Sequence, residues 1–150
     1  MKRIFLAVIG VVLACLMLAG MAEASVKKKV PPVVEIWVDI SSQAMAVDVD
    51  GWPYARWKVS TARDGYYTPR GSWRPFLLKK IHYSRKYDNS PMPNSIFFHG
   101  GYAIHATGYI KSLGRPASHG CIRLHPRNAL RLYGLVQKYG LRATRISINN

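Results

Sequence analysis

Acidic side chains are scarce in this chain. Its 150 residues contain 7 Asp and Glu against 22 Lys and Arg, which gives a formal net charge of +15. The last acid is Asp88, and residues 89–150 carry eight Lys and Arg with no Asp or Glu. A catalytic site built from this second half therefore has no carboxylate nearby in the sequence, which leaves a backbone carbonyl or a hydroxyl to orient a basic side chain.

Only one long hydrophobic run is present, and it lies at the N-terminus. Lys2 and Arg3 precede an apolar stretch over residues 4–20, and Ala-Glu-Ala at residues 22–24 forms an A-x-A cleavage site. These three regions predict a secretory signal peptide over residues 1–24. The alternative is a membrane anchor, but the run is only marginally long enough to span a bilayer. We expect an exported protein, periplasmic or cell-wall associated, with no stable membrane span after cleavage.

Cysteine is also rare, with two residues in the whole chain. Cys15 lies inside the predicted signal peptide. Lipidation there is disfavoured because residues 16–21 stay apolar or small where a processed lipoprotein would turn polar. Cys121 is then the only cysteine of the exported protein and has no disulfide partner. Exported proteins usually avoid a free thiol unless the sulfur does chemistry.

The charge left after cleavage indicates the kind of partner. Residues 25–150 keep 20 Lys and Arg against 6 Asp and Glu, a net charge of about +14. Cationic domains bind polyanions. An exported protein rarely meets nucleic acid, so we expect the anionic polymers of the cell envelope instead, although a role in solubility alone stays open.

The remaining sequence predicts one mainly β domain over residues 34–150, behind a charged, proline-containing leader at residues 25–33. A helix is predicted from Pro126, with Gly140 as its end. Residues 83–94 are expected to form an irregular loop or lid because they are polar and contain two prolines. Together these elements predict an antiparallel sandwich- or barrel-like fold with one main α-helix near the C-terminus. Strands are expected over residues 35–40, 44–49, 54–60, 72–82, 96–98, 103–105 and 142–148.

The run from Ser118 to Arg123, Ser-His-Gly-Cys-Ile-Arg, contains the residues with the clearest chemistry. A thiol attacks as the thiolate, and a nearby histidine can take its proton and hold the resulting ion pair. His105 ends one β segment and Cys121 begins another, so His105 is the expected base. Its tautomer would be fixed by a backbone carbonyl near Ala106 or by a hydroxyl.

Two neighbours of the cysteine have predicted roles of their own. Gly120 allows a sharp turn, which would point the N–H groups of Gly120 and Cys121 at one spot as an oxyanion hole. Arg123 lies two residues after Cys121, on the same face of a strand, where its guanidinium could grip a substrate carboxylate.

Less specific interpretations remain for these residues. Without its motif, Cys121 would more often be a small buried hydrophobic residue. A zinc site would need His105, His119, Cys121 and His125 together, but their spacing fits no familiar zinc pattern, and we predict no metal. The other histidines, His82 and His99 as well as His125, are expected to be structural or solvent-facing.

The segment from residue 104 to residue 124 closely resembles the L,D-transpeptidase catalytic domain, the YkuD family. The resemblance rests on Ile104-His105 and on the Gly-Arg-Pro-Ala-Ser-His-Gly-Cys-Ile-Arg-Leu run at residues 114–124. Upstream pieces agree over residues 59–61, 65–71 and 92–93. The likeness covers roughly residues 34–148, nearly all of the chain after the signal peptide.

This resemblance implies a nucleophile at Cys121 and a general base at His105, with His119 and Gly120 shaping the oxyanion hole. Substrate binding is assigned to Arg123 in the cleft, to Ser118 bracing the loop, and to Ala106.

The implied reaction is attack on a peptidoglycan stem tetrapeptide, which releases D-alanine and leaves a thioester. An amine of a second stem peptide then resolves the thioester into a 3→3 cross-link. Some relatives use a lysine of an outer-membrane lipoprotein, or water, as in an L,D-carboxypeptidase or endopeptidase. No cofactor is implied. A non-catalytic cationic wall-binding domain is the alternative from another class.

Overall fold

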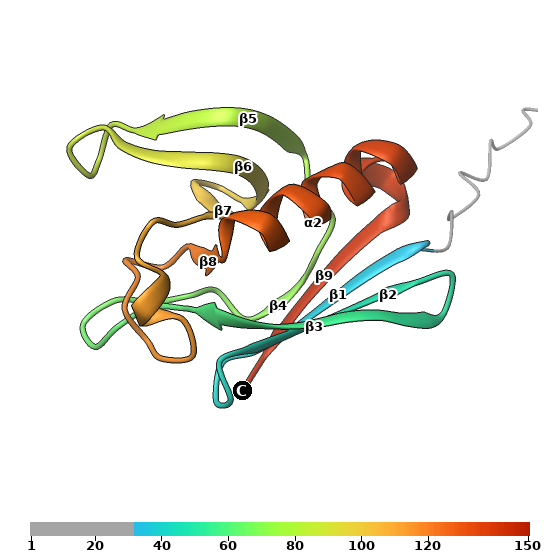
Figure 1. Cartoon of the computed structure of the whole chain (residues 1–150), viewed down its shortest axis with the longest axis horizontal. Helices are drawn as coiled ribbons and strands as arrows, with labels where there is room; N and C mark the ends of the chain where they lie inside the picture. Colours follow the sequence, from blue (N-terminus) through green and yellow to red (C-terminus); the bar gives the residue numbers. More distant parts are fainter. Residues whose placement is uncertain (1–31) are drawn as a thin grey trace, which may run out of the picture.

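Short alternating segments of β-forming residues build a sheet of nine strands in the computed structural model, which describes residues 32–150 (Figure 1). The predicted signal peptide, the lipidation alternative at Cys15 and most of the predicted leader lie outside the described residues. The strands are β1 (Val34–Asp39), β2 (Ala44–Val49), β3 (Trp52–Ser60), β4 (Gly71–Trp73), β5 (Leu77–Ser84), β6 (Ser90–His99), β7 (Tyr102–Ala106), β8 (Ile122–Leu124) and β9 (Thr144–Asn149).

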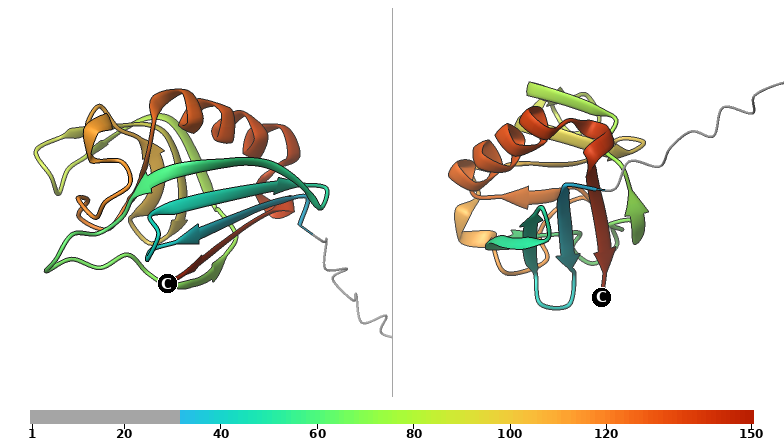
Figure 2. Two further views of the ribbon diagram at one scale, coloured as in Figure 1. Left: turned by 60° about the horizontal axis from the view of Figure 1, so that its bottom comes forward. Right: turned by 90° about the vertical axis from the view of Figure 1, so that its right-hand side faces the viewer.

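The sheet runs in the order β4-β9-β1-β2-β3-β8-β7-β6-β5 and curls into a half-barrel (Figures 1 and 2). Strand β3 joins the two halves, because it pairs along most of its length with β2 and at its end with β8. Two of the pairings, β1 with β9 and β7 with β8, are parallel, and the other six are antiparallel. The predicted mainly β, mainly antiparallel fold is confirmed.

One α-helix, α2 (Pro126–Tyr139), packs against β6 and β7 and closes one side of the curl. Pro126 occupies the first turn, and His125 caps it by accepting a hydrogen bond from the amide of Arg127. Ala129, Leu132 and Val136 recur at helical spacing and form the apolar stripe that α2 buries against the sheet. Two short 3₁₀ helices complete the structure, η1 (Ile110–Ser112) and η2 (Leu141–Ala143).

The core fills the space between the curled sheet and this helix. Its largest fully buried side chains come from strands of both halves and from α2, which ties the halves together. No helix within residues 32–150 is long and apolar enough to cross a membrane. These large, fully buried side chains include Ile36, Met45, Ile96, Ile104, Ile122, Leu124, Leu132, Ile146 and Ile148.

The single strand predicted over residues 72–82 is wrong, because the segment forms two strands with different partners. β4 pairs with β9 at one edge of the sheet, whereas β5 pairs with β6 at the other. Pro75 lies between them, and its missing N–H cannot join a ladder. The chain therefore changes from one half of the sheet to the other at this point.

The loop predicted over residues 83–94 is also wrong, since most of it belongs to the β5–β6 hairpin. Pro91 pairs with Tyr83, and Pro93 pairs with Ile81. β7 covers only the part of β6 from Ile96 onward, so the proline-containing part has a neighbour on one side alone. Two prolines spaced by two residues both turn their nitrogen toward that free side, where no N–H is required.

Candidate active site

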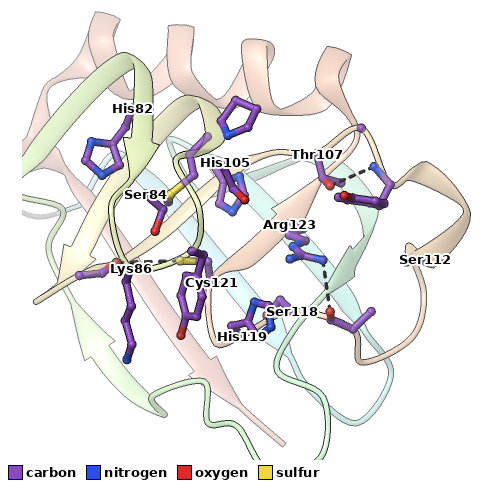
Figure 3. A pocket seen from close by; sticks show the side chains of 18 of the residues that line it. His82, Ser84, Lys86, His105, Thr107, Ser112, Ser118, His119, Cys121 and Arg123 are labelled. Carbon is purple, nitrogen blue, oxygen red and sulfur yellow. Dashed lines mark hydrogen bonds between the residues drawn. The ribbon is translucent and has the colours of Figure 1, made fainter.

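A cavity of about 960 Å³ opens between the β5–β6 hairpin, the end of β7 and the segment that leads into β8 (Figure 3). It is lined by Cys121, His105, His119, Ser118 and Arg123, so five of the seven predicted site residues meet there. The parallel pairing of β7 with β8 explains this, because it sets His105 directly opposite Arg123. Cys121 is the residue just before β8, two positions from Arg123.

The sulfur of Cys121 is partly buried, and the cysteine is free. Burial raises the pKa of the thiol, against smaller opposite effects of the Ala103 amide and the charge of Arg123. Its Sγ donates to the carbonyl oxygen of Gly101 at 3.9 Å. Within residues 32–150 this thiol donates no hydrogen bond to an imidazole, and the predicted contact between the two groups stays a prediction.

His105 is buried, with 7% of its surface exposed. Its Nδ1 lies 2.7 Å from the carbonyl oxygen of Ala106. A carbonyl only accepts, so Nδ1 carries the proton and Nε2 keeps its lone pair. This is the backbone contact that was expected to fix the tautomer of the base.

Burial lowers the pKa of His105 to about 4, with a smaller opposing effect of the Ala106 hydrogen bond and further lowering by Arg123. The imidazole of His105 and the thiol of Cys121 are therefore both neutral at rest. Burial disfavours the charged form of each group, and the ion pair expected from the sequence stays a prediction.

His119 lies at the mouth of the cavity among groups from three segments. Its Nε2 accepts a hydrogen bond from Arg63 Nη2 at 2.9 Å. The ring stacks on Tyr87 with a centroid distance of 4.4 Å and meets the edge of Tyr66 at 4.6 Å. Burial, then Arg63, Arg123 and Lys86, lower its pKa. Since the lone pair is already engaged, His105 is the better placed of the two as a base.

Gly120 has a φ of +127°, and an added Cβ would lie 2.6 Å from the ring of Tyr102 and 2.6 Å from the carbonyl of Tyr67. Its amide donates to Ser118 Oγ at 2.9 Å, and its carbonyl accepts from Thr68 Oγ1 at 2.9 Å. The predicted oxyanion hole of two adjacent amides stays a prediction, and in this structure one of the two amides donates to Ser118. Gly120 is fixed as a turn, and its N–H is already used.

Ser118 is fully buried, and its hydrogen bonds join two segments of the loop. Its amide donates to the carbonyl of Thr61, and its own carbonyl accepts from the amide of Arg63. Ala106 does not line the cavity: it is buried, and its carbonyl serves His105. The prediction that Ala106 binds substrate is therefore corrected. The carbonyl of Ala106 orients the imidazole of His105 instead.

Arg123 projects into the cavity from β8 (Figure 3). Its Nη1 donates to the carbonyl of Ala117 at 3.2 Å, and its guanidinium lies 5.7 Å from the centre of the Tyr109 ring. Burial lowers its pKa, partly offset by Cys121 and Tyr109. The remaining N–H groups are available to an anionic ligand.

Several cavity residues were missed by the sequence analysis. Arg63 and Tyr87 hold His119 in place, and neither lies in a motif. His82 was expected to be structural or solvent-facing, yet it lines the cavity and packs against the edge of Phe97 at 5.1 Å. Its alternation with Ser84 on one face of a strand was the available signal. His125 caps α2 through Nδ1 and is not among the residues lining the cavity.

A model of the L,D-transpeptidase catalytic domain family, YkuD, matches residues 34–148 of this chain. Comparison with curated protein sequences found no match.

Solved structures share the fold. An L,D-transpeptidase from Mycobacterium smegmatis is 23% identical with a TM-score of 0.70, over 79% of this chain and 59% of that one. One from Stackebrandtia nassauensis is 26% identical with a TM-score of 0.67, over 85% and 62%. L,D-transpeptidase 3 from Mycobacterium tuberculosis, solved with a faropenem-derived adduct, is 20% identical with a TM-score of 0.67, over 79% and 61%. This chain spans about three fifths of the length of these relatives.

Proposed function

This chain belongs to the YkuD family of L,D-transpeptidase catalytic domains, and we propose that it is a cysteine acyltransferase acting on peptidoglycan stem peptides. The observation that carries the proposal is the shared cavity of Cys121, His105 and Arg123, with the proton of His105 held on Nδ1. The free thiol can serve as nucleophile and the neutral imidazole as base for acyl transfer from an amide, and the cation can hold a carboxylate of the substrate.

In the first step, the thiol of Cys121 attacks the amide carbonyl that joins the third stem residue to D-alanine. His105 Nε2 takes the thiol proton as the C–S bond forms, and it gives the proton to the leaving nitrogen as the C–N bond breaks. This requires the thiol to rotate from the Gly101 carbonyl toward the imidazole. The distance of 3.9 Å marks that contact as weak, so the rotation costs little.

The negative oxygen of the intermediate needs donors that the sequence analysis placed at Gly120 and Cys121. With the Gly120 amide bound to Ser118, we assign the donor role to the amide of Cys121 itself and a positioning role to Gly120. In the second step an amine attacks the thioester, a C–N bond forms as the C–S bond breaks, and His105 passes the proton of the amine to the sulfur, which restores the thiol. No cofactor is required, because the thioester conserves the energy of the amide.

The acceptor is proposed to be an amine of another stem peptide, and a lipoprotein lysine or water are the alternatives. The proposed site of action is the cell envelope, after export. The test is to incubate the protein, with and without residues 1–24, with a disaccharide tetrapeptide and follow it by intact-mass spectrometry. We expect release of D-alanine and a mass increase equal to the disaccharide tripeptide acyl group. Cys121→Ala should show neither.

The products identify the acceptor. A cross-linked dimer supports the transferase, a free tripeptide supports the hydrolase, and equal turnover by Cys121→Ala would overturn the cysteine mechanism. Binding of wall fragments without an adduct would favour the non-catalytic wall-binding alternative. Faropenem is a useful second acyl donor, given the adduct in the M. tuberculosis relative. If faropenem forms an adduct and the disaccharide tetrapeptide does not, the thiol is reactive but the proposed acyl donor is wrong.

A further inference from the structure

The cavity has an excess of positive charge with nothing in the described part of the chain to balance it. Its lining contains four cationic side chains and no Asp or Glu. Arg63 and Arg123 have no carboxylate partner within residues 32–150. The two also act on each other, because the charge of Arg63 contributes to lowering the pKa of Arg123. The four cationic side chains are Arg63, Arg85, Lys86 and Arg123.

We propose that Arg63 forms a second anion-binding subsite in this cavity, separate from Arg123, which takes a free carboxylate of the stem peptide. The proposal rests on the proposed function and narrows it: the preferred donor carries two carboxylates on the part that stays bound after D-alanine leaves. Arg123 holds one of them, and Arg63 holds the other.

The guanidinium of Arg63 is held in place for this role. Its Nη2 donates to His119 Nε2 at 2.9 Å, and its Cζ lies 4.9 Å from the centre of the Tyr66 ring. The backbone is fixed as well, since the Arg63 amide donates to Ser118 and its carbonyl accepts from Tyr66. A guanidinium has five N–H donors, so one bond to His119 leaves an edge for a carboxylate. Ordering it before binding reduces the entropy lost when the ligand arrives.

Lys86 adds a positive charge to the cavity from the turn between β5 and β6. Its ammonium lies 5.5 Å from the centre of the Tyr87 ring, and Tyr87 stacks on His119. Arg63, Lys86 and Arg123 line the same cavity as His119, and after burial all three charges contribute to lowering the pKa of His119. A single carboxylate on Arg123 would leave Arg63 and Lys86 uncompensated, whereas a second one would relieve their repulsion.

The test uses three donors: a disaccharide tetrapeptide with all carboxylates free, and two versions in which either the second-residue or the third-residue side carboxylate is a carboxamide. Binding is measured by calorimetry to the full chain with Cys121→Ala, so that no reaction is needed. We expect each of the two carboxamides to weaken binding about 10- to 100-fold, the range for losing a hydrogen bond to a charged group, but only one of the two losses should depend on Arg63. Arg63→Gln should weaken the all-free donor by a similar factor.

The deciding result is the coupling between the two changes. In the Arg63→Gln background the carboxamide at the Arg63-bound position should have little further effect, whereas the other carboxamide should still weaken binding. Arg63→Lys should restore part of the discrimination. Arg70→Gln is the matched control, because Arg70 lies in the same loop, bonds to Asn150 and does not line the cavity. It should bind all three donors as the parent does.

Equal binding of all three donors by the parent would overturn the subsite. So would an equal loss in Arg63→Gln for free and amidated donors, since that would mark Arg63 as only a support for His119. These failures differ from failure of the proposed function. If a thioester forms at Cys121 but Arg63→Gln and the carboxamide act independently, only the subsite is refuted. If the two changes are coupled but no thioester forms, the subsite stands and the cysteine chemistry is refuted.

Discussion

Burial of His105 makes the stability of this protein depend on pH. In the unfolded chain its imidazole takes up a proton near pH 6.5, but in the native state only near pH 4. Between these values the unfolded state binds more protons, so stability rises with pH. The contribution of His105 is fully present above pH 6.5 and is lost as the pH falls to 4. A difference of about 2.5 pKa units corresponds to about 3 kcal/mol of unfolding free energy.

The measurement is urea unfolding followed by tryptophan fluorescence at several pH values from 7.5 to 4, for the wild type and His105→Gln. Glutamine keeps an amide that can donate to the Ala106 carbonyl but does not titrate. Other titrating groups are common to both proteins, so their effects cancel in the difference. We expect the wild type to lose about 3 kcal/mol more than the variant over this range.

Parallel pH profiles for the two proteins would refute this account. They would mean that the imidazole is solvated in the native state, and the neutral pair inferred for His105 and Cys121 would then have no physical basis. A larger loss in His105→Gln than in the wild type would reverse the sign and place a stabilised imidazolium in the fold.

Two further predictions concern the loop and the thiol. Gly120→Ala should lower the unfolding free energy by about 2 kcal/mol or more, because positive φ and a steric overlap act together, whereas Gly65→Ala, with open space around it, should lose about 1 kcal/mol. Chemical denaturation compares the two, and equal losses would show that the overlap relaxes. Iodoacetamide should alkylate Cys121 more slowly at pH 7 than it alkylates a free cysteine, since burial raises the pKa of the thiol. Fast alkylation with a plateau near neutral pH would instead indicate an ion pair with His105.

Residues that are close in the sequence were the ones that the sequence could predict. Cys121, Ser118 and Arg123 lie within six positions, and the turn at Gly120 and the following strand fix their relation. His105 was found because it ends an alternating segment that continues the family pattern. The strand over residues 44–49 and the helix from Pro126 also followed from periodicity and end signals, which are local.

Pairing between distant segments was less accessible. The parallel contact of β7 with β8 requires the chain over residues 107–121 to cross from one strand to the next, and no local signal marks such a crossing. Proline was the misleading signal in the β5–β6 hairpin. It excludes an interior strand, but the relevant part of β6 has only one neighbour. Whether a strand segment has a neighbour on one side or on both depends on the whole sheet, so the prolines in the segment cannot predict it.

The partial burial of Cys121 was equally invisible in the sequence, and it changes how the site should be understood. A permanent thiolate would be the most reactive state toward a substrate, but also the most readily oxidised. Burial keeps the thiol protonated at rest, and Nε2 of His105 remains free to accept its proton when the sulfur turns toward a bound amide. For an enzyme proposed to work outside the cytoplasm with a single unpaired cysteine, this arrangement ties formation of the reactive thiolate to occupation of the cavity.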